Sequence, residues 1–211
     1  MAEEKKYLRA ILTDCRIAMT PSCARARSRE IARRILASDF YRDAHIALLY
    51  ASTGNEVSTE ALLTDAFASG KIVMLPRYDR ARGRYEAARV DAIDKLVAGA
   101  FGILEPPADA PAALASDLAG ALVCVPGVAF GVMGQRLGRG QGHYDRFLAE
   151  FCADAITIGL AYSFQLLERI PEQEFDRRLN LIVTESAVYR AADASGRPRD
   201  TAGQGGTPGW L

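Results

Sequence analysis

Short apolar runs recur along the chain and constrain its fold more than any other feature. They lie at residues 45–52, 72–76, 121–127, 156–163 and 179–186. The first run, HIALLYAS, does not alternate apolar and polar residues, which is typical of a strand buried on both faces. Each run is short enough to be a strand of a globular protein. We therefore expect a sheet that is covered on both sides.

The segment between the first two runs has the spacing of an amphipathic helix. Ser58 or Thr59 can cap its start, and Gly70 can end it. Strand, helix and strand within about thirty residues form a βαβ unit, whose natural setting is a parallel sheet with helices on both faces. We expect the second strand, 72–76, to end at its proline, and 179–186 to be the last strand.

Further elements follow from local patterns. Helices are predicted at 3–18, from Thr20 and Pro21 to about Ala37, and at 144–155. Residues 84–90 have the character of an edge strand, and the proline-rich residues 101–116 that of a surface connection. The fold class is therefore α/β.

Size and composition favour one domain. A chain of 211 residues can bury about 70% of the surface of its unfolded form in one core. We expect the domain to span 1–189. Residues 190–211 are small, polar and glycine-rich, and we expect a disordered tail there.

Charge and cysteine content exclude several classes of protein. The net charge is zero, which argues against a general nucleic-acid partner. No apolar run is long enough to span a membrane, and the charged N-terminus does not resemble a signal peptide, so a cytoplasmic protein is expected. The four cysteines form no CxxC pair and there are only two histidines, which disfavours structural zinc.

A glycine-rich stretch, GQRLGRGQGHYDRF at 134–147, follows the most apolar strand. Glycines alternate at Gly138, Gly140 and Gly142, and a helix begins directly afterwards. Backbone NH groups in such a loop can bind an anion, arginines add phosphate donors, and Asp145 could hold magnesium against phosphate oxygens. The spacing fits neither a P-loop nor a dinucleotide-binding fingerprint. From spacing alone, phosphate binding and a plain flexible loop both remain open.

The same region carries a family resemblance. Residues 125–148, VPGVAFGVMGQRLGRGQGHYDRFL, resemble the signature of the 5-formyltetrahydrofolate cyclo-ligases, also called methenyltetrahydrofolate synthetases. Other segments match in the family's order, and the resemblance covers about residues 3–186. These segments are KKYLR with Lys5 and Arg9, NEVSTEALL with Glu56, LPRY at 75–78, GILEPP at 102–107, and residues 170–185.

The resemblance implies a single-domain, three-layer α/β/α sandwich around a mostly parallel sheet. It implies an enzyme that uses magnesium ATP to convert 5-formyltetrahydrofolate into 5,10-methenyltetrahydrofolate, with release of ADP and phosphate. Arg139 and Asp145 would be catalytic, and Asp145 and Asn180 would bind the metal. ATP would contact Lys5, Arg9, Arg136, Leu137, Gly138, Arg139, Gly140, Gln141, Gly142, His143 and Tyr144. The folate would contact Ala51, Glu56, Arg139, Gly140, Gln141, Gly142 and His143.

Three positions depart from the family pattern. Gln141 stands where some members have lysine and others glycine, and His143 replaces the first tyrosine of a Tyr-Tyr-Asp triplet. Asn180 stands where the family often has a second metal-binding aspartate. These departures keep open a folate- or nucleotide-binding homologue without turnover. A separate alternative is a related ATP-using enzyme for another heterocycle, against which the presence of Glu56 in the matching segment argues. We expect small-molecule substrates as partners and a monomer.

Overall fold

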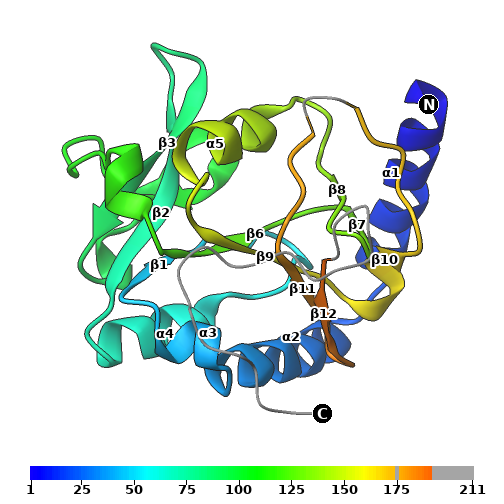
Figure 1. The fold of residues 1–211 in the computed structure, drawn as a ribbon, viewed down its shortest axis with the longest axis horizontal. Helices are drawn as coiled ribbons and strands as arrows, with labels where there is room; N and C mark the ends of the chain where they lie inside the picture. Colours follow the sequence, from blue (N-terminus) through cyan, green and yellow to red (C-terminus); the bar gives the residue numbers. More distant parts are fainter. Residues whose placement is uncertain (174–175, 192–211) are drawn as a thin grey trace.

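The computed structural model describes residues 1–173 and 176–191, and a seven-stranded sheet forms its centre (Figure 1). The strand order is β12-β11-β9-β6-β1-β2-β3. The five inner strands are parallel, and both edge strands, β12 and β3, are antiparallel to their neighbours. The strands are β1 (Ile46–Leu48), β2 (Ile72–Asp79), β3 (Arg84–Val90), β6 (Leu122–Val125), β9 (Ile156–Leu160), β11 (Leu181–Val183) and β12 (Val188–Arg190).

Helices cover both faces of this sheet, which confirms the three-layer sandwich. In Figure 1, α2 (Pro21–Leu36), α3 (Asp39–Arg42) and α4 (Glu60–Ala68) lie on one side and α5 (His143–Phe151) on the other. Successive residues of a strand point to opposite faces. Accordingly, Leu122 and Cys124 of β6 belong to the core on the α2 side, and Val123 and Val125 to the core on the α5 side.

The remaining helix, α1 (Ala2–Ile17), lies away from the main sheet and packs on a small second sheet (Figure 1). That sheet has the order β10-β7-β8, from Leu166–Leu167, Ala129–Gly131 and Arg136–Leu137. Leu12 of α1 is buried against Val128, Ala129 and Leu137. A two-stranded ribbon, β4 (Val97–Ala98) with β5 (Leu104–Glu105), interrupts the expected surface connection.

The expected helices form with small shifts. Thr20 caps α2 by accepting a hydrogen bond from the Cys23 amide at 3.3 Å. Helix α5 ends at Phe151, four residues before the expected end at 155. The βαβ unit of β1, α4 and β2 is present, and Gly70 has the positive φ of 73° expected after a helix.

Strand β2 does not end at its proline, contrary to expectation. It continues through Pro76 to Asp79 and pairs along this length with β3. Its parallel neighbour β1 reaches only as far as Met74. Pro76 therefore lies where β2 has a neighbour on one side alone, and a missing NH donor is tolerated there.

The C-terminal boundary also differs from expectation. A further strand, β12, follows β11, so residues 179–186 are not the last strand. Arg190 belongs to β12 and Ala191 is buried, although both were expected in the tail. The rest of the predicted disordered tail, 192–211, lies outside the described residues.

Candidate functional site

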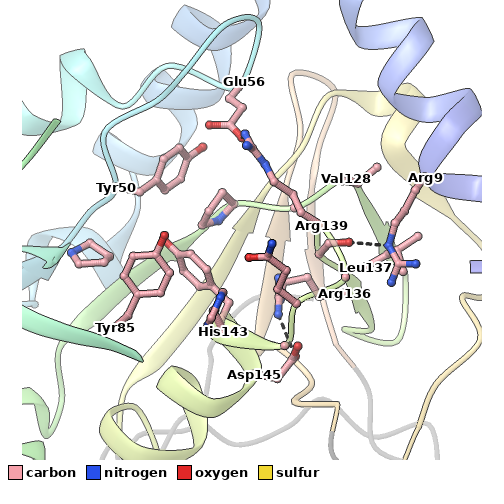
Figure 2. A pocket seen from close by; sticks show the side chains of 18 of the residues that line it. Arg9, Tyr50, Glu56, Tyr85, Val128, Arg136, Leu137, Arg139, His143 and Asp145 are labelled. Atoms are coloured by element: carbon pink, nitrogen blue, oxygen red, sulfur yellow. Dashed lines mark hydrogen bonds and ion pairs between the residues drawn. The ribbon is translucent and has the colours of Figure 1, made fainter. Parts of the chain in front are cut away.

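A cavity of about 320 Å³ lies beyond the carboxyl ends of β1 and β6 (Figure 2). Tyr50 and Ala51 follow β1, and Pro126 and Gly127 follow β6. Ligands of open α/β sheets bind at such strand ends. Except for Asn180, every site residue predicted from the sequence lines this cavity: Lys5, Arg9, Ala51, Glu56 and the whole stretch Arg136, Leu137, Gly138, Arg139, Gly140, Gln141, Gly142, His143, Tyr144 and Asp145.

Two of the alternating glycines are required by the backbone. Gly140 has a φ of +103° and Gly142 a φ of +65°, both in the region that glycine adopts without steric cost. Gly142 is the N-cap of α5, so the helix begins at His143 and its free amides face the glycine loop. The partial positive charge of a helix N-terminus therefore adds to the cations of the loop.

Helix α1 brings cations to the same cavity. The Lys5 ammonium group forms an ion pair with the Asp176 carboxylate at 2.6 Å, and Lys5 is only 7% exposed. The Nε atom of Arg9 donates to the carbonyl of Gly138 at 2.9 Å. These contacts hold α1 against the glycine loop and place both cations beside it.

Arg136 and Asp145 form a second ion pair, at 2.8 Å between Nη2 and Oδ1. The Arg136 side chain is 3% exposed and its guanidinium lies over the Tyr144 ring at 5.6 Å. Its buried Nε meets no hydrogen-bond partner among the described residues. A buried guanidinium without its carboxylate would be strongly unfavourable, so Asp145 has a structural as well as a chemical role.

Glu56 lies across the cavity from this pair (Figure 2). Its Oε1 accepts from Arg139 at 2.7 Å, and its Oε2 accepts from the amide and hydroxyl of Thr53 at 3.1 and 3.2 Å. The Tyr162 hydroxyl donates to the Glu56 backbone carbonyl at 3.2 Å. The carboxylate is thus held at the cavity wall as a hydrogen-bond acceptor.

Aromatic rings form the wall between these two charged regions. His143 meets Tyr78 and Tyr85 edge-on, with ring centroids at 5.4 and 5.9 Å. Burial raises the pKa of Tyr85 and raises that of Tyr144 far more, so both phenols stay protonated near neutral pH. Rings at these positions can pack against a flat heterocycle.

His143 is held by Arg146, whose Nη2 lies 2.8 Å from its Nδ1. Burial, and secondly the charge of Arg146, lower the pKa of His143 below its ordinary value. Because an arginine only donates, Nδ1 of the neutral ring accepts, and the proton resides on Nε2. His143 therefore offers one NH donor.

Asn180 is the predicted site residue that the structure does not bring to the cavity. It precedes β11, whereas the cavity lies beyond the opposite ends of the parallel strands. Its amide oxygen accepts from the Thr157 amide at 2.8 Å and the Thr157 hydroxyl at 2.7 Å. The predicted pairing of Asn180 with Asp145 as metal ligands is not supported by this geometry.

Sequence reasoning missed two charged residues that line the cavity, Asp176 and Arg16. Asp176 is the ion-pair partner of Lys5. Arg16 follows Lys5 by eleven residues, which is three helical turns, so it shares a helix face with Lys5 and Arg9. That spacing was the signal that could have identified it.

The described residues contain no group of three or more histidine, cysteine, aspartate or glutamate side chains close enough to hold a metal ion by themselves. Magnesium does not need such a cage, because it usually binds one or two carboxylates together with substrate phosphates. Asp145, beside the glycine loop, fits that kind of site. No helix within the described residues is long and apolar enough to cross a membrane.

The known proteins that this sequence resembles are 5-formyltetrahydrofolate cyclo-ligases. A sequence profile of the 5-formyltetrahydrofolate cyclo-ligase family matches residues 1–185. The chain belongs to this family. The Escherichia coli K12 5-formyltetrahydrofolate cyclo-ligase is 31% identical over 176 residues, which cover 82% of this chain and 96% of the relative. The mouse 5-formyltetrahydrofolate cyclo-ligase is 27% identical over 195 residues, which cover 88% and 92% of the two chains.

A solved structure supports the same family. The Aquifex aeolicus 5,10-methenyltetrahydrofolate synthetase is 31% identical and superposes with a TM-score of 0.78. The match covers 90% of this chain and 93% of that protein. The chain therefore has the fold of this solved structure over the matched part of its length.

Proposed function

We propose that the chain catalyses the ATP-dependent cyclisation of 5-formyltetrahydrofolate to 5,10-methenyltetrahydrofolate, with release of ADP and phosphate. The observation that carries this proposal is the composition of one cavity: a cationic glycine loop at one end and the Glu56 carboxylate at the other, joined by aromatic rings. The cationic loop can bind the phosphates of a nucleotide, and Glu56 with the aromatic rings can bind a folate, so one cavity can hold both substrates.

The phosphates of ATP bind at the glycine loop. Lys5, Arg9, Arg136 and Arg139 line it, and the amides at the start of α5 add donors. Positively charged groups and backbone amides are the means by which proteins bind and stabilise phosphoryl groups. The two ends of the glycine run, Gly138 and Gly142, let the backbone approach the phosphate chain.

Magnesium, when bound, would neutralise developing charge on the phosphate oxygens. Asp145 would hold it, together with oxygens of the nucleotide. Asp145 is paired with Arg136 and would have to leave it to bind magnesium. Phosphate oxygens can replace the Asp145 carboxylate as acceptors for Arg136, so the carboxylate becomes available to the cation.

The folate binds at the other end of the cavity. Glu56 accepts hydrogen bonds from NH groups of the pterin, and Ala51 leaves room for the ring beside it. Tyr85 and His143 pack against the flat part of the substrate, and Nε2–H of His143 donates to it. This arrangement points the formyl group toward the glycine loop and Arg139.

The reaction requires no covalent nucleophile on the protein. The formyl oxygen attacks the terminal phosphorus and ADP leaves. Nitrogen 10 then attacks the formyl carbon, and phosphate leaves with the former formyl oxygen while nitrogen 10 loses its proton. The protein's contribution is to align the two substrates and to stabilise charge on the phosphoryl group, which is the usual mode of catalysis for phosphoryl transfer.

The proposal is tested by measuring phosphate release and methenyl absorbance in the same sample, with magnesium ATP and with or without 5-formyltetrahydrofolate. Equal amounts of both products, formed only with the folate, are expected. Arg9→Gln should raise the KM for ATP, whereas Arg25→Gln, at an exposed position of α2, should not. Binding of both substrates without either product would instead support a non-catalytic homologue, and turnover of another heterocycle alone would support a different enzyme.

The proposal includes a monomer working in the cytoplasm on these small molecules, without nucleic acid or membrane partners. Sedimentation of the purified protein would check the oligomeric state.

A further inference from the structure

Glu56 lies near two arginines that differ sharply in their surroundings. The Arg139 side chain is 61% exposed and contacts Oε1 of Glu56 at 2.7 Å. The Arg16 side chain is only 12% exposed, and its Nη1 lies 3.8 Å from the same oxygen. Exposed ion pairs contribute little to holding a side chain, whereas charges removed from solvent interact much more strongly. Burial therefore strengthens the interaction of Arg16 with the Glu56 carboxylate despite its longer distance.

The two arginines also differ in the rigidity of their backbones. Arg139 lies in the glycine run, directly before Gly140, whose φ is +103°. Arg16 lies in the last turn of a 16-residue helix, α1, which is fixed along its length by Lys5, Arg9 and the buried Leu12. From Lys5 to Arg16 the helix rises roughly 16 Å, enough to reach from the phosphate end of the cavity to its folate end.

The Glu56 loop is tied to the same end of α1. The side-chain amide of Asn55 donates to the backbone carbonyls of Arg16 and Met19, at 3.0 and 2.9 Å. The Arg16 carbonyl also accepts from the Met19 amide at 3.3 Å, so Asn55 adds a second donor to that carbonyl and a donor to the carbonyl of Met19. The two Asn55 bonds fix the residue next to Glu56 relative to the residue that carries the guanidinium. The closeness of Arg16 and Glu56 is thus built into the backbone contacts.

We propose that Arg16 is a positioning residue for substrate recognition: it holds the Glu56 carboxylate charged and oriented toward the folate, so that Arg139 can serve the transferred phosphoryl group. This inference rests on the proposed function, because Glu56 contacts the folate only there. Among the described residues, Arg16 makes no side-chain hydrogen bond, and Glu56 is its only ion-pair partner. Arg16 also lines the cavity.

The test compares Arg16→Gln, Arg16→Lys and Arg25→Gln with the unaltered protein. Arg25→Gln is the control, because it removes an equal charge from an exposed position of the adjacent helix. Arg16→Gln should raise the KM for 5-formyltetrahydrofolate about tenfold or more, since about 1.4 kcal/mol corresponds to a factor of ten, and leave the KM for ATP unchanged. Arg16→Lys should recover part of the loss, because the charge is retained.

A second comparison uses Glu56→Gln, alone and combined with Arg16→Gln. If Arg16 acts through Glu56, the double variant should bind 5-formyltetrahydrofolate no more weakly than Glu56→Gln alone, as measured by direct titration without ATP. Fully additive losses, or equal effects on both KM values, would overturn the inference. An active wild type whose Arg16→Gln variant behaves like Arg25→Gln would overturn it while leaving the proposed function intact. A wild type without turnover would contradict the proposed function itself.

Discussion

Asp145→Asn should destabilise the protein even before any substrate is added. The partner of Asp145, Arg136, has a side chain that is 3% exposed, and Asp145 itself is 21% exposed. Breaking a buried ion pair by removing one charge costs about 3–5 kcal/mol. Asparagine keeps a carbonyl oxygen as acceptor, so the lower end, about 3 kcal/mol, is expected. For a domain of this size that corresponds to a fall in Tm of about 6–12 °C.

Thermal unfolding followed by circular dichroism measures this effect. Glu150→Gln is the matched control, because Glu150 lies on the same helix and pairs with Arg84 at 2.7 Å with both side chains about two-fifths exposed. That exposed pair should contribute at most about 1 kcal/mol. Turnover should be lost in Asp145→Asn and retained in Glu150→Gln. Equal melting temperatures for the two variants would refute the idea that Arg136 depends on Asp145 in the folded protein.

Three further predictions concern Asn180, His143 and Gly140. Asn180→Asp should leave the magnesium dependence of turnover unchanged, because Asn180 does not line the cavity; a magnesium titration would detect any gain. Since burial and Arg146 lower the pKa of folded His143, the unfolded chain binds more protons on acidification, and stability should fall as the pH is lowered through the ordinary histidine pKa of 6.5. His143→Gln should lose less stability over this range in denaturant titrations, and identical pH profiles would contradict the expectation. Gly140→Ala, at a φ of +103°, should raise the KM for ATP, whereas Gly83→Ala, at +65° in an exposed turn, should cause similar backbone strain without that effect.

The main sheet was predictable because its central strands are buried on both faces. Such strands are continuous apolar runs, and their order along the chain, with a helix between the first two, indicates parallel pairing. The passage of β2 beyond Pro76 was not predictable, since it depends on where the neighbouring strand β1 ends. Likewise, β12 has only three residues, Val188–Arg190, and pairing with β11 rather than an apolar pattern defines it.

The site divides in the same way. The glycine loop and Asp145 are close in sequence, so their spacing alone indicates an anion site beside a helix start. Glu56 could be placed only through the family resemblance, because a single acidic residue in a loop has no distinctive pattern. Assigning roles by family resemblance was less successful at Asn180. Its position matches a family motif, but its side chain is hydrogen-bonded to Thr157, away from the cavity. Asp176 could not be predicted from the sequence, because only the fold brings this residue, 171 positions away in the chain, beside Lys5.

The cavity carries its own counter-charges, and this explains how its cations can be buried at all. Two buried cations are paired with acids, Lys5 with Asp176 and Arg136 with Asp145, and the exposed Arg139 is paired with Glu56. Buried charges without partners would be prohibitively unfavourable. An incoming phosphate chain must therefore compete with carboxylates for the same donors, which limits its affinity in the absence of a metal. A magnesium ion that engages Asp145 would remove one competitor while it neutralises the phosphates, so phosphate binding and metal binding should be mutually reinforcing at this site.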